Sequence, residues 1–329
     1  MEVRLVVAGG LAGLIFGYVL MRSNLCFHSA TRGLFSGHSG LAKAWALGVS
    51  IAAVGLVVIY SFSHWDNLNQ GLPLRPVGNL AGGVLFGIGM VVAASCASGL
   101  FYKLGSGMLG AAAGIAGWIA GQLIVERIQV PGPTLLPAGE AATLPGWLGV
   151  PRAAVTLPLA AIVIFSLLRS GKQESEGRQW GWPLAGTALG LATIIGWVLA
   201  GVGGASFGPS TIGAVSAASA GRPNWWLTAF LVALVPGATI AARTSGGWLV
   251  RGETGTRYVQ LALGGVLIGA GGLIAGGCNL GHGVSGAAQL SISSFVTIAG
   301  MIGGVALAAA VRERLAEPLR DWRPSIRPT

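Results

Sequence analysis

The sequence predicts an all-α polytopic membrane protein with nine transmembrane helices. Of its 329 residues, 53% are hydrophobic and only 9% are charged, and the mean hydropathy is +0.72. Soluble domains carry about 25% charged residues, so this composition excludes an ordinary water-soluble globule. The 56 glycines follow no G-X-Y period, which excludes collagen. They are typical of small residues that let membrane helices approach closely.

A transmembrane helix needs about 20 mostly apolar residues. We find nine such segments, at residues 3–20, 41–62, 79–95, 108–126, 151–169, 181–200, 225–243, 258–276 and 292–311. The first has only Arg4 ahead of its apolar run and no convincing small-residue cleavage site, so we interpret it as a span and not as a signal peptide. We expect one membrane transport domain over 1–311, with a first half over 3–126, a connecting helix over 151–169, a second half over 181–311 and then a basic cytoplasmic tail over 312–329.

The basic residues predict the orientation of the chain. Nine spans place the termini on opposite sides, and cytoplasmic loops carry the excess of Lys and Arg. With the N-terminus outside, the fifteen on the inner side are Arg22, Arg32, Lys43, Lys103, Arg169, Lys172, Arg178, Arg243, Arg251, Arg257, Arg312, Arg314, Arg320, Arg323 and Arg327. The five on the outer side are Arg4, Arg75, Arg127, Arg152 and Arg222. Because the net charge of +10 is spread in ones and twos and forms no basic domain, we expect no nucleic-acid partner.

An internal repeat places the three cysteines in one register. Cys26, Cys96 and Cys278 each lie 13 residues after the first glycine of a Gly-x-x-x-Gly pair, at Gly13, Gly83 and Gly265. In the second and third copies another glycine follows three residues after the cysteine, at Gly99 and Gly281. A weaker fourth copy runs through 186–208 and places Ser206 near the cysteine position. The glycine pairs alone indicate helix packing, and a single membrane cysteine is typically a small core residue. Three cysteines in one register favour a function.

The two halves are expected to be inverted in the membrane. Four spans plus one connecting span separate them, and inverted repeats are a common transporter construction with the site near the midplane. The segments after the repeated positions are too short or too rich in Gly and Ser to span, and we expect them to fold back into the protein as loops with short helices: 27–40, 97–107, 207–223 and 279–291. Such irregular backbone is tolerated at membrane depth where it is buried or lines a cavity. Ordinary loops outside the membrane are the alternative.

The polar residues of these segments favour an anion over a cation. Residues 258–311 contain no Asp, Glu, Lys or Arg, and the four expected fold-back segments contain no acidic residue. Cation paths usually display carboxylates inside the membrane. Short helices that begin near the midplane would instead direct N–H groups and partial positive charge at the site. Gly99, Ser206, Gly281 and His282 are expected to support this path or the helix N-termini. His282 either caps a helix or donates a hydrogen bond to the anion.

Thiols suit an anion whose charge sits partly on sulfur. A cysteine buried among apolar groups stays protonated, because desolvation disfavours the thiolate. Neutral S–H groups are weak donors, and a series of them would pass a soft anion along without trapping it. This chemistry suggests an oxyanion of sulfur or of selenium, and it leaves phosphate and halide open.

Three runs around the cysteines resemble the YeeE/YedE family of bacterial membrane proteins, which carry a sulfur-transport domain. They are Arg-Ser-Asn-Leu-Cys-Phe ending at Phe27, Ala-Ser-Cys-Ala-Ser-Gly ending at Gly99, and Gly-Gly-Cys-Asn-Leu-Gly-His-Gly-Val-Ser-Gly ending at Gly286. The resemblance covers about residues 5–310. It implies an hourglass-shaped fold of nine spanning and four short helices in the bacterial inner membrane. It also implies thiosulfate uptake along Cys26, Cys96 and Cys278, and a separate TusA-like sulfur carrier as a soluble partner. Some relatives are linked to selenium.

We therefore expect a thiosulfate permease of the inner membrane, with no enzymatic activity, cofactor or metal. A selenium-compound transporter of the same family is one alternative. Another is a membrane sulfurtransferase that forms a persulfide, which needs an activated thiolate; Cys96 with Lys103 seven residues later is the only loose candidate. A third is a structural membrane anchor for a soluble enzyme, which leaves the repeated cysteines without a purpose.

Overall fold

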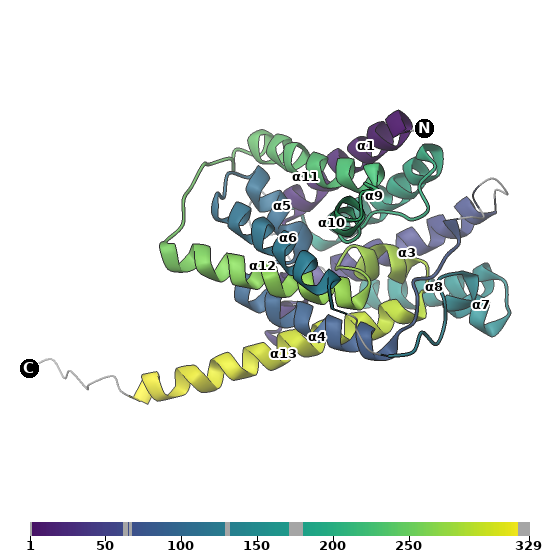
Figure 1. Ribbon diagram of the computed structural model, residues 1–329. Helices are drawn as coiled ribbons and strands as arrows, with labels where there is room; N and C mark the ends of the chain where they lie inside the picture. Colours follow the sequence, from purple (N-terminus) through teal and green to yellow (C-terminus); the bar gives the residue numbers. More distant parts are fainter. Residues whose placement is uncertain (1, 62–64, 66–67, 129–131, 171–179, 322–329) are drawn as a thin grey trace, which may run out of the picture.

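The computed structural model describes residues 2–61, 65, 68–128, 132–170 and 180–321, with side chains as far as residue 314. All regular elements within these ranges are helices (Figure 1). Eight of the described helices are long and apolar enough to cross a membrane. They are α1 (Glu2–Ser23), α3 (Gly40–Tyr60), α4 (Pro76–Ala93), α8 (Arg152–Arg169), α9 (Trp182–Gly203), α11 (Trp225–Thr244), α12 (Gly255–Ala275) and α13 (Ile292–Asp321).

The ninth expected span, over 108–126, corresponds to the shorter apolar helix α6 (Gly110–Glu126). Its 17 residues rise about 25 Å at 1.5 Å per residue, somewhat less than the roughly 30 Å hydrocarbon core. A ninth crossing at α6 therefore stays a prediction.

Short helices occupy the four segments expected to fold back. They are α2 (Phe27–Phe35), α5 (Ala97–Gly105), α10 (Ala214–Ser219) and η3 (Gly281–Gly286). The third segment is the least regular, because α10 has only 6 residues and the chain before it forms turns and bends. Two further short elements, η2 (Glu140–Ala142) and α7 (Leu144–Leu148), were not expected from hydropathy, because they lie in a connection and not in an apolar run.

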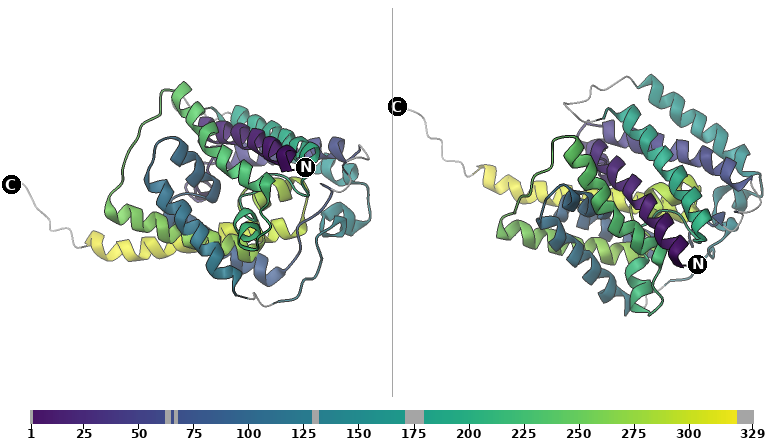
Figure 2. Two further views of the ribbon diagram at one scale, coloured as in Figure 1. Left: turned by 45° about the horizontal axis from the view of Figure 1, so that its top comes forward. Right: turned by 90° about the horizontal axis from the view of Figure 1, so that it is seen from above.

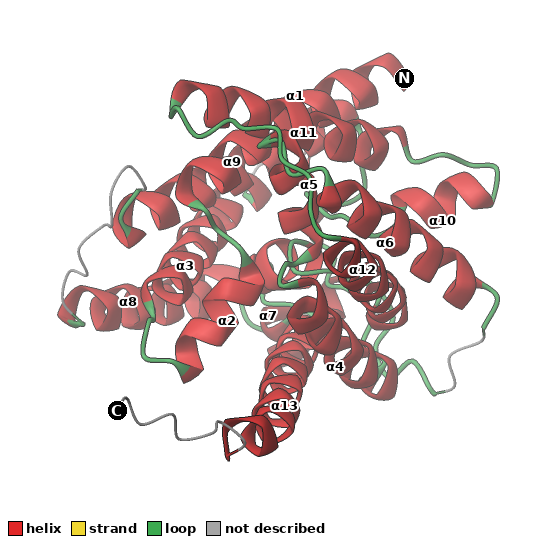
Figure 3. Ribbon diagram, turned by 90° about the vertical axis from the view of Figure 1, so that its left-hand side faces the viewer, coloured by secondary structure: helices red, strands yellow, loops and turns green. Residues whose placement is uncertain are grey.

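The large helix contacts join elements on opposite sides of the connecting helix α8 in the sequence. Helix α1 packs against α11 and α9, and α3 packs against α9. Helix α4 packs against both α12 and α13, while α6 packs against α12. Figure 2 (right) shows α1, in purple, running between α11 and α9. Helix α8 lies at the edge of the protein against α3 (Figure 3), and only 11% of its residues are buried. The helices before α8 are thus interleaved with those after it.

The repeated glycine pairs sit where these helices cross. A Cβ atom added at Gly13 or Gly17 of α1 would lie 2.2 or 2.1 Å from the carbonyl oxygens of Phe230 and Leu234 in α11. The other two pairs meet carbonyl oxygens one helical turn apart in the same way: Gly83 and Gly87 at Thr297 and Met301 of α13, and Gly265 and Gly269 at Gly114 and Trp118 of α6. Only a residue without a side chain allows this approach, which confirms the packing interpretation of the glycines.

The connection that follows α3 and the connection that follows α6 pair with each other and bind to residues just after η3. Residues Gly71 and Leu74 pair with Gly139 and Leu136 in isolated bridges. The Leu72 N–H donates to the hydroxyl of Ser291 at 3.0 Å, and the Leu144 N–H donates to the carbonyl of Leu290 at 2.8 Å. All six residues of η3 are buried, so this covering keeps its polar backbone away from the surroundings.

Substitution of one repeated glycine tests the crossing of α1 with α11. We expect Gly13→Ala to lower the thermal unfolding temperature in detergent, because the added methyl group overlaps the backbone of α11. The matched control is Gly10→Ala in the same helix, where nothing lies within 4 Å of the new Cβ. The control should be neutral or gain up to about 1 kcal/mol from helix propensity. Equal stability of the two variants would contradict the packing.

Candidate functional site

The repeated cysteines each follow the same turn at the end of a long helix. In each copy the residue two positions earlier is left-handed: Asn24 (φ 50°), Ala94 (φ 49°) and Gly276 (φ 78°). The next N–H donates to the carbonyl five residues earlier, from Leu25 to Leu20, Ser95 to Met90 and Gly277 to Gly272. This bond and the left-handed residue form a Schellman motif. Ser206 stands at the same place, after Gly204 (φ 81°) and an Ala205 to Ala200 bond.

Two of the cysteines meet. The Cys26 thiol donates to the sulfur of Cys96 across 3.4 Å, and the two side chains are 2% and 0% exposed. Cys26 precedes α2 and Cys96 precedes α5, each as the N-cap residue. A disulfide would hold the sulfurs about 2.05 Å apart, so both remain free thiols.

Gly99 borders both sulfurs of this pair. A Cβ atom at Gly99 would lie 3.2 Å from the sulfur of Cys96, 3.3 Å from that of Cys26 and 2.5 Å from the Ser95 hydroxyl. A side chain there would overlap the Ser95 hydroxyl and crowd both sulfurs, so the close packing of the two thiols against α5 requires glycine at this position. Gly281 has the corresponding place near the third cysteine, 2.9 Å from the Ser210 hydroxyl and 3.8 Å from the sulfur of Cys278.

Cys278 has a different environment. Its buried sulfur accepts hydrogen bonds from the backbone N–H groups of Gly281, at 3.2 Å, and Thr211, at 3.3 Å. The Ser210 hydroxyl lies 4.0 Å away. Ser210 and Thr211 belong to the fourth segment, so the third and fourth copies meet at this sulfur. Two backbone N–H groups thus converge on this sulfur, and one of them, from Gly281, belongs to the short helix η3.

Two polar side chains connect Cys278 to the cysteine pair. The sulfur of Cys96 lies 3.5 Å from the hydroxyl of Ser98, which accepts a hydrogen bond from the Asn279 amide at 2.9 Å. Asn279 adjoins Cys278 in the chain. Its amide oxygen and the hydroxyl of Thr211 are buried and have no hydrogen-bond partner among the described residues. Sequence reasoning did not single out Ser98 and Asn279, although both lie within the cysteine motifs and could have been found there.

Ser206 lies away from the three sulfurs. It is exposed and lines a pocket of about 330 Å³ with Leu5 of α1, Arg222 and Trp225. Ser210, four residues later, is the serine that approaches Cys278.

A second pocket lies at the opposite end of α1. It has about 320 Å³ and is lined by His28 and Arg32 of α2, Ala94 after α4, and Arg312 and Glu313 of α13. His28 and Ala94 each lie two residues from a cysteine of the pair. The Lys103 ammonium group donates to the Ala94 carbonyl at 2.8 Å, where it caps the end of α4.

His282 is held by protein groups on both ring nitrogens. Nε2 lies 3.0 Å from the Ala275 carbonyl oxygen and Nδ1 lies 2.9 Å from the Ser294 hydroxyl. Because a carbonyl only accepts, Nε2 carries the proton and Nδ1 accepts from Ser294. His282 thereby ties η3 to α12 and α13. Among the described residues, no group of three His, Cys, Asp or Glu side chains is arranged to hold a metal ion.

We expect His282→Ala to destabilise the protein. The variant leaves a buried carbonyl and a buried hydroxyl without partners, at a cost of about 1–3 kcal/mol each. Thermal unfolding of purified protein measures the loss. Ser294→Ala removes only the Nδ1 contact and should cost less. If His282→Ala unfolds at the wild-type temperature, the ring has no such structural role.

The chain was compared with known proteins. A family model described as sulphur transport matches residues 22–307. The chain is 30% identical over 310 residues to the thiosulfate transporter TsuA of Spirochaeta thermophila, covering 88% of this chain and 93% of that protein. It is 24% identical to the thiosulfate transporter TsuA of Escherichia coli, covering 92% and 93%. It is also 34% identical over 100 residues to the probable transporter YedE of Salmonella typhimurium, covering 30% and 24%. The chain therefore belongs to the sulphur transport family, as its cysteine motifs predict.

Proposed function

We propose that this protein is a permease of the bacterial inner membrane that takes up thiosulfate or a similar sulfur anion. The observation that carries the proposal is the chain of buried groups that links three free thiols through Ser98 and Asn279. The two full-length relatives named above are thiosulfate transporters. The names of these relatives suggest the substrate, and the polar groups between the thiols suggest where it would bind.

The proposed path begins at the pocket of Ser206 and Arg222. From there the anion passes to the N–H groups of Thr211 and Gly281 at Cys278, and then along Asn279 and Ser98 to the Cys96 and Cys26 pair. It leaves through the pocket of His28 and Arg32. The two pockets border opposite ends of α1, since one includes Leu5 and the other follows residue 26. Neutral thiols between two pockets that contain arginine would bind the anion weakly enough to release it.

An inverted repeat with four re-entrant helices is the architecture that we propose for this path. If α1, α3, α4 and α6 correspond to α9, α11, α12 and α13, the contact of α1 with α11 is repeated by α9 with α3. The contact of α4 with α13 is likewise repeated by α12 with α6. The four shared Schellman turns support the same correspondence. With α6 as the ninth span, this gives the hourglass shape that the family resemblance implies.

The proposed orientation determines which pocket faces which side of the membrane. The fifteen basic residues expected on one side and five on the other favour a periplasmic N-terminus and a cytoplasmic C-terminus. The Ser206 pocket then opens outside and the His28 pocket opens inside. A TusA-like sulfur carrier would meet the anion at the inner pocket, and a selenium anion would be accepted by the same thiols.

Uptake of labelled thiosulfate into proteoliposomes tests the path. Replacing Cys26, Cys96 or Cys278 by Ala removes one weak donor and should lower the rate at least about tenfold, which corresponds to one lost interaction of about 1.4 kcal/mol at the barrier. The matched control is Ser50→Ala, another small buried side chain, whose hydroxyl bonds only within its own helix to Ala46. Uptake that is unchanged in all three cysteine variants, at equal amounts of inserted protein, would refute the thiol path. Selenium anions are tested as competitors in the same assay.

A sulfurtransferase would leave covalent sulfur on the protein. Lys103 is bound to the Ala94 carbonyl, and the sulfur of Cys96 contacts Cys26 and Ser98 instead, so no cation among the described residues hydrogen-bonds this thiol to activate it. We therefore expect the intact mass to be unchanged after incubation with thiosulfate. A gain of about 32 Da, one sulfur atom, that is lost in Cys96→Ala would favour the enzyme over the permease.

A further inference from the structure

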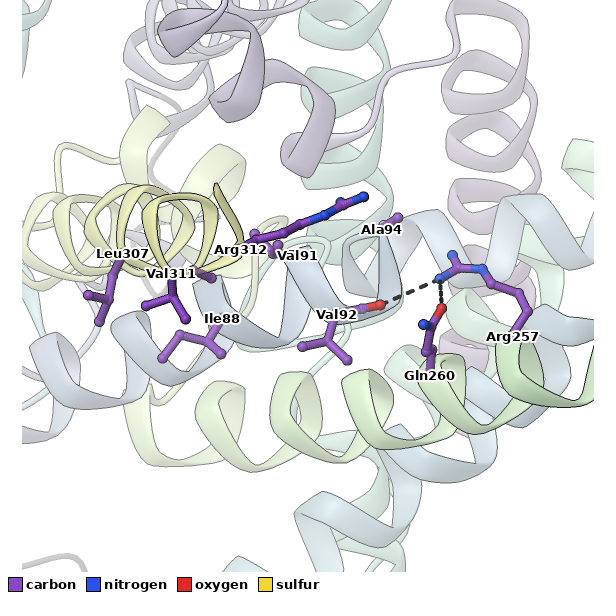
Figure 4. A pocket seen from close by; sticks show the side chains of 10 residues that line it. Ile88, Val91, Val92, Ala94, Arg257, Gln260, Leu307, Val311 and Arg312 are labelled. Carbon is purple, nitrogen blue, oxygen red and sulfur yellow. Dashed lines mark hydrogen bonds between the residues drawn. The ribbon is translucent and has the colours of Figure 1, made fainter. Parts of the chain in front are cut away.

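A large groove lies beside the end of α4 and adjoins the pocket of His28, with which it shares Val91, Ala94 and Arg312. It has a volume of about 740 Å³ and is formed by α4, the beginning of α12 and the later part of α13. Figure 4 shows its side chains, with α13 on one side of α4 and α12 on the other. Its lining residues are Ile88, Val91, Val92, Ala94, Arg257, Gln260, Leu307, Ala308, Val311 and Arg312.

The groove begins where the close glycine contacts between α4 and α13 end. Helix α13 meets α4 through Gly300 and Gly304, and no glycine follows in this helix. Helix α12 meets α4 through Gly264 and Gly271, and the groove residues Arg257 and Gln260 precede them. On the α13 side, larger side chains such as Leu307 and Val311 follow Gly304 and separate this helix from the last turns of α4.

The walls of the groove suit a lipid chain. Leu307 and Val311 are 53% and 48% exposed, and they lie in an apolar helix long enough to span the membrane. The walls therefore face hydrocarbon in the membrane. Because lipid tails are as apolar as leucine, such walls admit an acyl chain and provide little selectivity among lipids.

The charged end of the groove provides that selectivity. Arg257 is fixed in place, because its guanidinium donates to the carbonyls of Val92, at 3.5 Å, and Ala93, at 2.5 Å, and to the Gln260 side chain at 3.2 Å. A guanidinium has five N–H groups, so further donors remain beside these three bonds. Arg312 lines the groove from α13. Two guanidinium groups at the end of an apolar groove are complementary to a phosphodiester attached to acyl chains.

We propose that this groove binds an anionic phospholipid of the inner leaflet, with the phosphate between Arg257 and Arg312 and an acyl chain along Ile88 and Leu307. Basic pockets between transmembrane helices on the cytoplasmic side recognise anionic head groups. Because lipid binding depends on the membrane-facing walls and not on the cysteines, the proposal stands whether or not the chain transports thiosulfate.

Native mass spectrometry of the full chain, released from nanodiscs, tests the proposal. The nanodiscs contain equal amounts of phosphatidylglycerol and phosphatidylcholine with identical acyl chains. We expect preferential retention of phosphatidylglycerol, reduced about fivefold by Arg312→Gln because one basic contact is lost. The matched control is Arg314→Gln, which removes the same charge from the same helix outside the groove. Ala308→Phe, which fills the groove, should reduce retention of both lipids.

Three results would overturn the proposal. They are equal retention of the two lipids by wild type, equal loss of preference in Arg312→Gln and Arg314→Gln, and displacement of bound phosphatidylglycerol by millimolar thiosulfate. The second would indicate a diffuse effect of the basic helix end. The third would assign Arg312 to the route of a free anion, since it also lines the pocket of His28. The elution profile and the thermal unfolding temperature of each variant are also measured, so that lipid retention is compared only among folded proteins.

Discussion

The turn that ends each of four long helices is the feature on which the site depends. Inside a bilayer, a backbone that leaves a helix needs partners for its polar groups, and the Schellman bond supplies one at each of these ends. The turn fixes the direction of the next residues, so a cysteine two positions later is placed in the same way each time. Ala94 adopts this left-handed conformation without being glycine, and Lys103 holds its carbonyl.

The sequence predicted the long helices well because hydropathy and length are local properties. It also predicted that Cys26, Cys96 and Cys278 share one register, since the glycine pairs that mark the register are visible in the chain. It did not predict that Cys26 would lie against Cys96 and apart from Cys278. That distinction depends on which helices cross: the glycines mark one side of each crossing, but the carbonyl oxygens that they meet carry no sequence signal.

The fourth copy illustrates the same limit. Ser206 occupies the register position of the cysteines, yet it is exposed in a pocket, whereas Ser210 and Thr211 approach Cys278. The short α10 begins only at residue 214, so the irregular chain before it continues past the serine before it returns to helix. Similarly, the sequence left open for His282 both a structural role and a bond to the anion, and it gave no sign that the Ser294 hydroxyl and the Ala275 carbonyl are its partners.

The interleaving of helices from the two sides of α8 affects how the protein can assemble. Helix α1 takes its large contacts from α9 and α11, and α4 takes its contacts from α12 and α13. During synthesis, the early helices are therefore inserted into the membrane before their main neighbours have been made. Until the later helices arrive, the glycine faces of the early ones are bare in the bilayer. The main contacts of the early helices can therefore form only after synthesis has passed α8, and until then these helices lie in the membrane without their main neighbours.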